Sequence, residues 1–242
     1  MKNLTGKCRS AIDCYKMIER DDFISVGVSG GKDSLVLLST LLELRNYYPV
    51  PFKVLAVTVD PGFSGARENF SSITDFCNTH GVKHVIKRTE LSKLIFEERR
   101  EKNPCSLCSR MRRGIIHNVA VENVCNKVAL GHNLDDAVET FFMNLLNCGR
   151  IGCFSPISYL SRKKLRVIRP LIFCEERELE LESGRQNLPV VKSGCPVDGK
   201  TERQATKDFI NLLGKDYQNI KKKVIGAIIK SNVDDWGKGN IL

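Results

Sequence analysis

The hydrophobic positions along the chain follow two different spacings. Short β-branched runs predict buried strands at residues 24–28, 54–59, 82–86, 127–130 and 167–171. Between them, apolar residues recur every three or four positions and predict helices at 34–45, 67–80, 111–123 and 136–147. Strands that alternate with helices in this way form a parallel sheet with helices on both faces. We therefore predict an α/β fold built on a parallel, five-stranded, doubly wound sheet.

The pattern changes after Pro170. A charged helix is predicted at 175–187, an amphipathic helix at 202–213, and a further helical pattern at 217–230, where Lys221, Lys222 and Lys223 interrupt the apolar positions. These additions divide the chain into three predicted parts. They are a short helical segment at 1–20, a main domain at 21–213 and a helical tail at 214–242.

Composition narrows the function only slightly. The chain has 242 residues, of which 42% are hydrophobic and 27% charged, with a formal net charge of +10. Such a charge is compatible with a polyanionic partner such as nucleic acid. No apolar run reaches the roughly 18 residues of a membrane span, and the first residues lack the apolar core of a signal peptide. We expect a cytoplasmic protein that is not in a membrane.

A glycine-rich loop joins the first predicted strand to a helix. Two adjacent glycines let backbone amides approach a phosphate, and the helix N-terminus adds its positive end. An ordinary nucleoside-triphosphate loop has Ser or Thr after its lysine, where this chain has Asp, which argues against ordinary γ-phosphate hydrolysis. The alternative is a simple turn capped by the aspartate. The predicted phosphate-binding residues are Ser29, Gly30, Gly31, Lys32, Asp33 and Ser34.

Two further segments follow predicted strands and should face the same crevice, because ligands of such sheets bind at the carboxyl ends of the strands. One is Asp60, and the other begins at Gly131 and His132 and continues to Asp135 and Asp136. The last two carboxylates stand at a predicted helix start, where they would favour the helix dipole. They cap the helix, hold the Mg²⁺ that neutralises a nucleotide, or do both.

Ten cysteines without an export signal argue against a disulfide framework. Cys105 and Cys108 form a C-x-x-C at a predicted helix start, and Cys195, in a turn before Pro196, is the best third ligand. Spacing alone leaves a metal or cluster site, a redox pair and incidental cysteines open. Three thiolates would leave one position of a cluster open, and sulfide suits that soft site. The other seven cysteines are interpreted as packing residues.

The string SGGKDS resembles the loop of the PP-loop, or N-type, ATP pyrophosphatases, whose fold is of the adenine nucleotide alpha hydrolase type. Together with CSLCSRMRRG, ALGHNLDDAVETFFMNLL, RVIRPL and the late Cys-Pro, it resembles the tRNA 2-thiocytidine synthetase family (TtcA). The likeness runs from about Cys8 to Leu213. Lysidine synthetases share the loop without these cysteines, and thiouridine relatives usually add zinc-binding cysteine pairs that this chain lacks.

The resemblance implies a mechanism. ATP and Mg²⁺ would bind at residues 29–34 with Asp60, Gly131 and His132 nearby, and Asp136 or Asp135 would support the cation. The 2-carbonyl oxygen of a cytidine in a tRNA anticodon loop would be adenylated, and pyrophosphate would leave. Sulfide on a [4Fe–4S] cluster would then attack carbon 2, and AMP would leave. The implied cluster ligands are Cys105, Cys108 and Cys195, and with Asp136 they are the predicted catalytic residues.

The resemblance also implies partners. The substrate would be tRNA, the sulfur donor a cysteine desulfurase or free sulfide, and a homodimer is expected on the likeness alone. Arg110, Arg112 and Arg113 would contact tRNA phosphates, unless they form a solvated basic helix face. Three alternatives stay open at this point: a lysidine-type adenylating ligase, a thiolase of another nucleoside with a structural metal, and a nucleotide-binding sensor.

Overall fold

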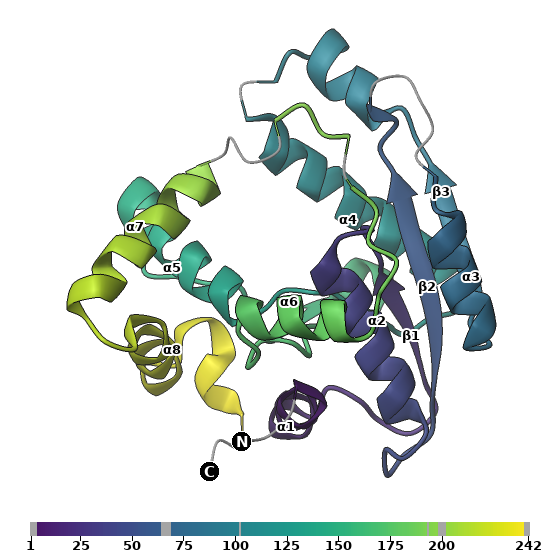
Figure 1. Ribbon diagram of the computed structural model, residues 1–242, viewed down its shortest axis with the longest axis horizontal. Coiled ribbons are helices and arrows are strands. Elements are labelled where there is room, and N and C mark those ends of the chain that lie inside the picture. The colour runs from purple at the N-terminus through teal and green to yellow at the C-terminus, as the bar shows by residue number, and fades with distance from the viewer. Residues whose placement is uncertain (1–3, 64–68, 102, 193, 198–201, 240–242) are drawn as a thin grey trace.

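The computed structural model describes residues 4–63, 69–101, 103–192, 194–197 and 202–239 (Figure 1). In this part of the chain one sheet has six strands in the order β3-β2-β1-β4-β6-β5. All neighbours are parallel except β5 and β6, which are antiparallel. The strands are β1 (Asp22–Gly27), β2 (Phe52–Asp60), β3 (His84–Arg88), β4 (Lys127–Ala129), β5 (Ile157–Leu160) and β6 (Leu165–Ile168).

Helices connect and cover the strands. The α-helices are α1 (Leu4–Tyr15), α2 (Lys32–Arg45), α3 (Ser71–Thr79), α4 (Pro104–Glu122), α5 (Leu134–Cys148), α6 (Glu176–Arg185), α7 (Glu202–Asp216) and α8 (Ile220–Lys230). Shorter helical turns are η2 (Lys93–Glu98), η3 (Ser161–Lys163) and η4 (Val233–Lys238). In Figure 1, α7 and α8 lie on the side of the molecule opposite α3 and β3.

The sheet separates two hydrophobic cores, because successive side chains of a strand point to opposite faces. In β2, Val54 and Ala56 join the core formed with α1, α2, α3, α5 and α6, whereas Leu55 and Val57 join the core beneath α4 and η2. Every one of these four side chains is at most 7% exposed. A strand buried on both faces reads as a continuous apolar run, which is why the sequence identifies it.

The predicted α/β sheet is confirmed, but with six strands where we predicted five, and it is not wholly parallel. The missed strand is β5, which lies at the edge of the sheet and turns back along β6. The helix predicted from residue 111 begins seven residues earlier, at Pro104. The helix predicted from residue 67 begins at Ser71, and residues 67 and 68 lie outside the described part of the chain. The turn η2 was not predicted.

Both ends of the described chain pack into the first core. In η4, Trp236 is fully buried, and its backbone oxygen accepts a hydrogen bond from Tyr15 Oη at 2.8 Å. The boundaries proposed at residues 20 and 213 stay predictions. Across the described ranges, no helix combines the length and the apolar character that crossing a bilayer requires.

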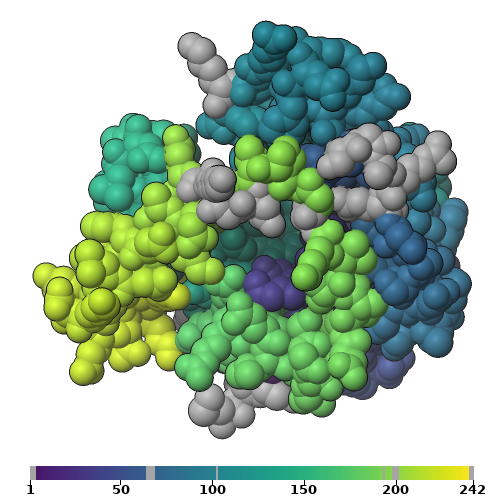
Figure 2. Space-filling view, turned by 45° about the horizontal axis from the view of Figure 1, so that its top comes forward, coloured from purple at the N-terminus to yellow at the C-terminus, as the bar shows by residue number. Residues whose placement is uncertain are grey.

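The strand order places a crevice above β1. The chain proceeds from β1 to β2 and β3 on one side of the sheet, and β4 pairs with β1 on the other. When the chain leaves two adjacent strands toward opposite sides of the sheet, the loops after those strands diverge. Ligands bind in the space between the two loops. Figure 2 shows a hollow on this side of the molecule, with atoms of the first part of the chain at its floor.

Candidate active site

The loop after β1 is closed by its own hydroxyl groups. Ser34 Oγ accepts a hydrogen bond from Ser29 N–H at 3.0 Å and donates one to the Gly31 oxygen at 2.8 Å. Gly30 has φ = +89°, a backbone angle that favours glycine. The loop leads directly into α2 at Lys32, so its amides and the positive helix end face the crevice.

The two charged residues of the loop have carboxylate neighbours. Lys32 Nζ lies 3.0 Å from Glu176 Oε1 and 3.4 Å from Asp33 Oδ1. Burial opposes its charge, but Asp33, Glu176 and Glu180 outweigh burial and raise the pKa of Lys32. Burial also raises the pKa of Asp33 to about 6, with Lys32 opposing the shift and the carboxylates of Asp136 and Glu176 adding to it. Asp33 Oδ1 is buried and accepts no hydrogen bond within the described residues.

The acidic segment caps α5. Asn133 and Asp136 form a reciprocal capping box, in which Asp136 Oδ2 accepts from Asn133 N–H at 3.0 Å. Asp136 Oδ1 accepts from Arg203 of α7 at 3.0 Å. Burial raises the pKa of Asp136, and Arg203 opposes that rise. The capping interpretation is therefore confirmed for Asp136, and a role in binding Mg²⁺ stays a prediction.

Asp135 joins three helices. It accepts a hydrogen bond from the Glu176 N–H at the start of α6 at 2.7 Å and one from Lys221 of α8 at 2.5 Å. Its side chain is only 6% exposed. Both oxygens are thus engaged in holding the C-terminal helices.

Two other predicted site residues, Gly131 and Asp60, differ in their relation to the phosphate loop. Gly131 packs on the phosphate loop, because a Cβ there would lie 3.2 Å from the Asp33 carbon and the Ser34 nitrogen. Asp60 ends β2 with its side chain turned to Arg88, whose Nη1 donates to Oδ2 at 2.9 Å, and to the Gly62 amide. Asp60 is absent from the described lining of the cavity, and its role in binding ATP stays a prediction.

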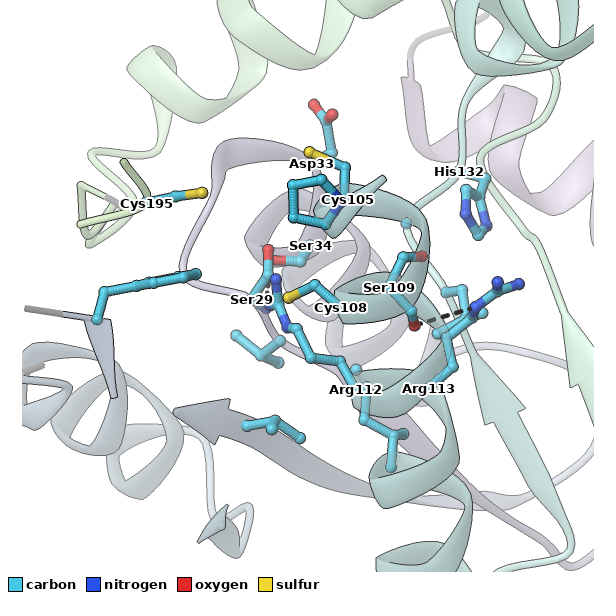
Figure 3. Close-up of a pocket in the computed structure, with 18 of the residues that line it drawn as sticks. Ser29, Asp33, Ser34, Cys105, Cys108, Ser109, Arg112, Arg113, His132 and Cys195 are labelled. Carbon is cyan, nitrogen blue, oxygen red and sulfur yellow. Dashed lines mark hydrogen bonds between the residues drawn. The ribbon is translucent and has the colours of Figure 1, made fainter. Parts of the chain in front are cut away.

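The C-x-x-C opens α4. Asn103 caps the helix by accepting from Ser106 N–H at 3.3 Å, and Pro104 occupies the first turn. This start sets Cys105 and Cys108 at the helix end that faces the crevice. In Figure 3, Cys195 lies across from them on a separate segment, and its sulfur points toward the α4 terminus.

One cavity of about 440 Å³ contains both motifs. Its lining includes Ser29, Asp33 and Ser34 of the loop together with all three predicted cluster cysteines, Cys105, Cys108 and Cys195. Gly131, His132, Arg112 and Arg113 also line it, whereas the described lining does not include Gly30, Gly31, Lys32 or Arg110. Sequence reasoning missed its apolar wall. Residues in β2, just after β2, in η2 and in α4 form this wall, namely Val59, Phe63, Phe96 and Ile116.

The three cysteines influence one another electrostatically. Burial raises the pKa of Cys108, Arg112 lowers it, and Cys195 and Cys105 raise it further. Among the described residues, no three His, Cys, Asp or Glu side chains stand close enough together to hold a single metal ion. Cysteines that hold a four-iron cluster bind different irons and stand further apart than the ligands of one zinc ion.

The segment that carries Cys195 is attached to the phosphate loop. Val191 N–H donates a hydrogen bond to the Gly30 oxygen at 3.0 Å. A Cβ at Gly30 would lie 3.3 Å from Val191 Cβ, so the two backbones approach closely. The third cysteine thus lies four residues after a backbone contact with the loop.

Comparison with known proteins agrees with this geometry. A family described as a PP-loop domain matches residues 7–192. The chain is similar to the tRNA-cytidine(32) 2-sulfurtransferase of Syntrophotalea carbinolica, at 37% identity over 94% of this chain and 87% of the relative. The protein of the same name from Geobacter metallireducens is 36% identical, over 94% of this chain and 88% of its own. The matched share exceeds the stretch from Cys8 to Leu213 and so extends into the tail.

A solved structure has a similar fold. The U34-tRNA thiolase NcsA from Methanococcus maripaludis, with its [4Fe-4S] cluster, superposes with a TM-score of 0.75 at 26% identity. The match covers 93% of this chain and 76% of that protein.

Proposed function

The chain belongs to the PP-loop family and, within it, to the tRNA-cytidine 2-sulfurtransferases, and from this premise we propose that it is an ATP-dependent tRNA sulfurtransferase. It adenylates the 2-carbonyl oxygen of a cytidine in the anticodon loop of tRNA, releasing pyrophosphate, and then replaces that oxygen with sulfur, giving 2-thiocytidine and AMP. The observation that carries the proposal is that the phosphate loop and Cys105, Cys108 and Cys195 line one cavity. Activation and sulfur delivery require that proximity.

The loop performs the first step. Backbone amides of residues 29–34 and the N-terminus of α2 bind the β- and γ-phosphates that depart as pyrophosphate. Lys32 is within reach of the same phosphates once it leaves Glu176, with which it pairs at 3.0 Å. The apolar wall of Val59, Phe63 and Phe96 suits the adenine base and excludes water from the adenylate.

The three cysteines supply the second step. Their thiol donors, set around one cavity, fit a [4Fe–4S] cluster held by three protein ligands. When bound, such a cluster supplies one iron without a protein ligand, a soft site suited to sulfide. The chain's own contribution is to hold that site beside the loop that activates the oxygen.

Asp33 is the best-placed residue for Mg²⁺. Its Oδ1 lies 3.4 Å from the Lys32 ammonium but accepts no hydrogen bond among the described residues, and its side chain lines the cavity. Asp136 lies close enough to raise the pKa of Asp33. Asp135 is less suited to the cation, since both of its oxygens bind other helices.

The test uses anaerobically reconstituted protein. We expect visible iron–sulfur absorption and formation of 2-thiocytidine from ATP, sulfide and tRNA, measured by mass spectrometry of the nucleosides. Cys195→Ser should lose thiolation at least a hundredfold. Cys148→Ser, which changes an exposed cysteine outside the cavity, should keep it. Colourless protein that holds zinc tightly, or a fully active Cys195→Ser, would contradict the proposal.

A second candidate acts on uridine in place of cytidine. The observation that favours it is the likeness to NcsA, a U34-tRNA thiolase. The same mass spectrometry separates the two, because 2-thiouridine and 2-thiocytidine differ in mass. A lysidine-type ligase would make neither product and would tolerate Cys195→Ser.

The remaining partners rest on the proposed reaction. Its substrate is tRNA, and a cytoplasmic location stays a prediction. The sulfur donor, a cysteine desulfurase or free sulfide, and the homodimer stay predictions.

A further inference from the structure

One buried cation near the site lacks a counter-ion. Arg169 follows β6 and is 6% exposed. The other buried charged side chains of the described chain, those of Asp22, Asp60, Lys127, Asp135 and Glu139, each contact an oppositely charged residue. No described carboxylate lies within salt-bridge distance of Arg169. A buried charge without a partner is costly and seldom occurs without a functional reason.

The neighbours of Arg169 are neutral acceptors and an aromatic ring. Its Nη1 donates to the Ser155 oxygen at 2.6 Å and to Ser158 Oγ at 3.3 Å, and its guanidinium carbon lies 5.1 Å from the centre of the Phe154 ring. These contacts position the side chain without neutralising it. Burial, followed by the charge of Arg113, lowers the pKa of Arg169 to about 10.

Unpartnered polar atoms gather at this place. Five buried side-chain nitrogen or oxygen atoms of the described residues lack a hydrogen-bond partner, and three of them are Arg169 Nε, His132 Nδ1 and His117 Nε2. The His132 ring lies 5.0 Å from the Phe154 ring, which Arg169 also contacts. Groups of this kind are normally satisfied. Their concentration indicates a ligand that brings acceptor oxygens.

Two members of the cluster belong to the cavity wall. Arg113 and His132 line the cavity, and in Figure 3 both lie on the side of α4 that faces away from Cys195. Burial and the nearby arginines lower the pKa of His132 to about 3. This ring is therefore neutral at physiological pH, and positive charge at this wall comes from Arg113 and Arg169.

We propose that Arg113, His132 and Arg169 form a second anion subsite that binds a backbone phosphodiester of the tRNA next to the target nucleotide. A phosphodiester carries one negative charge and acceptor oxygens that match a guanidinium. The nucleotide phosphates already have the loop and the α2 terminus. The subsite rests on the proposed function, because only a nucleic acid acceptor brings a further phosphate into the same cavity. Arg113 contacts the phosphate, and Arg169 supplies buried positive charge behind it.

The first experiment measures binding of an anticodon stem-loop RNA to the reconstituted protein at several salt concentrations. Arg169→Met and Arg113→Met should each raise the RNA Kd about tenfold and reduce the slope of log Kd against log salt by about 0.7. The affinity for ATP should change less than twofold. Arg185→Met, which alters an exposed arginine paired with Glu182 on α6, is the matched control and should leave the RNA Kd unchanged.

A second experiment keeps the wild-type protein and changes the RNA. A neutral methylphosphonate replaces one phosphodiester at a time on either side of the target nucleotide. One position should reproduce the tenfold loss with wild-type protein and cause no further loss with Arg113→Met or Arg169→Met. This arm remains decisive if Arg169→Met does not fold.

The outcomes separate the sources of the phosphate. Weakened ATP binding with unchanged RNA binding would assign the subsite to the nucleotide and overturn the proposal, and so would equal binding of every methylphosphonate RNA. Thiolation by the wild-type protein is measured in parallel. If 2-thiocytidine forms while all RNAs bind alike, the subsite fails and the proposed function stands. If the binding pattern appears without thiolation, the proposed function fails and the subsite stands.

Discussion

Lys127 and Arg169 are two buried cations at opposite ends of neighbouring strands in the same sheet. Lys127 begins β4 and is 2% exposed, and Arg169 follows the neighbouring β6 and is 6% exposed. Lys127 Nζ lies 2.7 Å from Asp22 and 2.8 Å from Glu19. Arg169 contacts serine oxygens and a phenylalanine ring.

The difference separates two uses of buried charge. At the amino ends of the strands, the protein's own carboxylates neutralise Lys127, so this ion pair contributes to a defined structure. At the carboxyl ends of the strands, where ligands of such sheets bind, the charge of Arg169 is available to an incoming anion. Removal of the Lys127 charge should therefore lower the free energy of unfolding, whereas removal of the Arg169 charge should leave it unchanged or raise it.

The largest effect is expected at Lys127. Lys127→Met leaves the carboxylate of Asp22, itself 2% exposed, buried without its cation, and should lower the free energy of unfolding by about 3–5 kcal/mol. Urea denaturation measures it. Arg166→Met is the matched control, because Arg166 is the register partner of Lys127 and also contacts Glu19, but at the surface. It should cost about 0.5 kcal/mol, and equal losses would contradict the interpretation.

The next effect concerns Asp33 and depends on pH. Its pKa of about 6 in the folded protein lies above the ordinary value of 3.8, so ionisation of Asp33 destabilises the fold. Asp33→Asn removes that cost and should raise the free energy of unfolding above pH 6 by up to about 3 kcal/mol, from 1.36 kcal/mol per pKa unit. As pH falls from 6 to below 3.8, the folded wild type takes up the proton and the advantage disappears. Urea denaturation at pH 8, 5 and 3.5 tests this, and an advantage that grows with acidity would overturn it.

A smaller loss is expected where α7 is held against α5. Arg203 of α7 contacts Asp136 and Glu139, each at 3.0 Å, and the Glu139 side chain is 8% exposed. Arg203→Met should cost about 2 kcal/mol, between the values for exposed and buried pairs. Hydrogen exchange should show α7 opening first. Lys222→Met, which removes an exposed pair with Glu175 at 3.6 Å, serves as the control and should have almost no effect.

The smallest stability effect is expected at Arg169. Replacing a buried, uncompensated charge by an apolar side chain of similar length is often neutral or stabilising. Arg169→Met should therefore change the free energy of unfolding by less than about 0.5 kcal/mol, or raise it, measured by urea denaturation. A loss of stability as large as that of Lys127→Met would show that Arg169 is structural and would remove the contrast between the two buried cations.

The central strands and the loop were predictable from the sequence because their signals are local. Strand β2 is buried on both faces and reads as one apolar run. The edge strand β5 was missed because it has one neighbour in the sheet and is not fully buried, with Tyr159 62% exposed. Its turn into β6 uses Lys164 with φ = +51°, without the glycine that usually marks such a turn.

The site was predictable where one motif carries the chemistry and unpredictable where partners are distant in sequence. The loop and the C-x-x-C each lie within a few residues, so the sequence reveals them as candidates, although the spacing of the cysteines alone left a cluster, a redox pair and incidental cysteines open. Asp135 was one of two candidates for Mg²⁺, and the sequence could not show its pairing with Lys221, which is 86 residues away. Arg169 was part of a recognised string, yet only the fold reveals that no carboxylate of the described residues forms an ion pair with it.

The hydrogen bond from Val191 to Gly30 has a consequence for how such a chain can change over evolutionary time. Cys195 is four residues from that bond. A substitution that alters the path of the loop backbone therefore shifts a sulfur atom as well, even when every cysteine is retained. The phosphate loop and the segment of Cys195 are therefore expected to change together during evolution. A descendant that no longer binds the nucleotide would also lose the arrangement of its thiols.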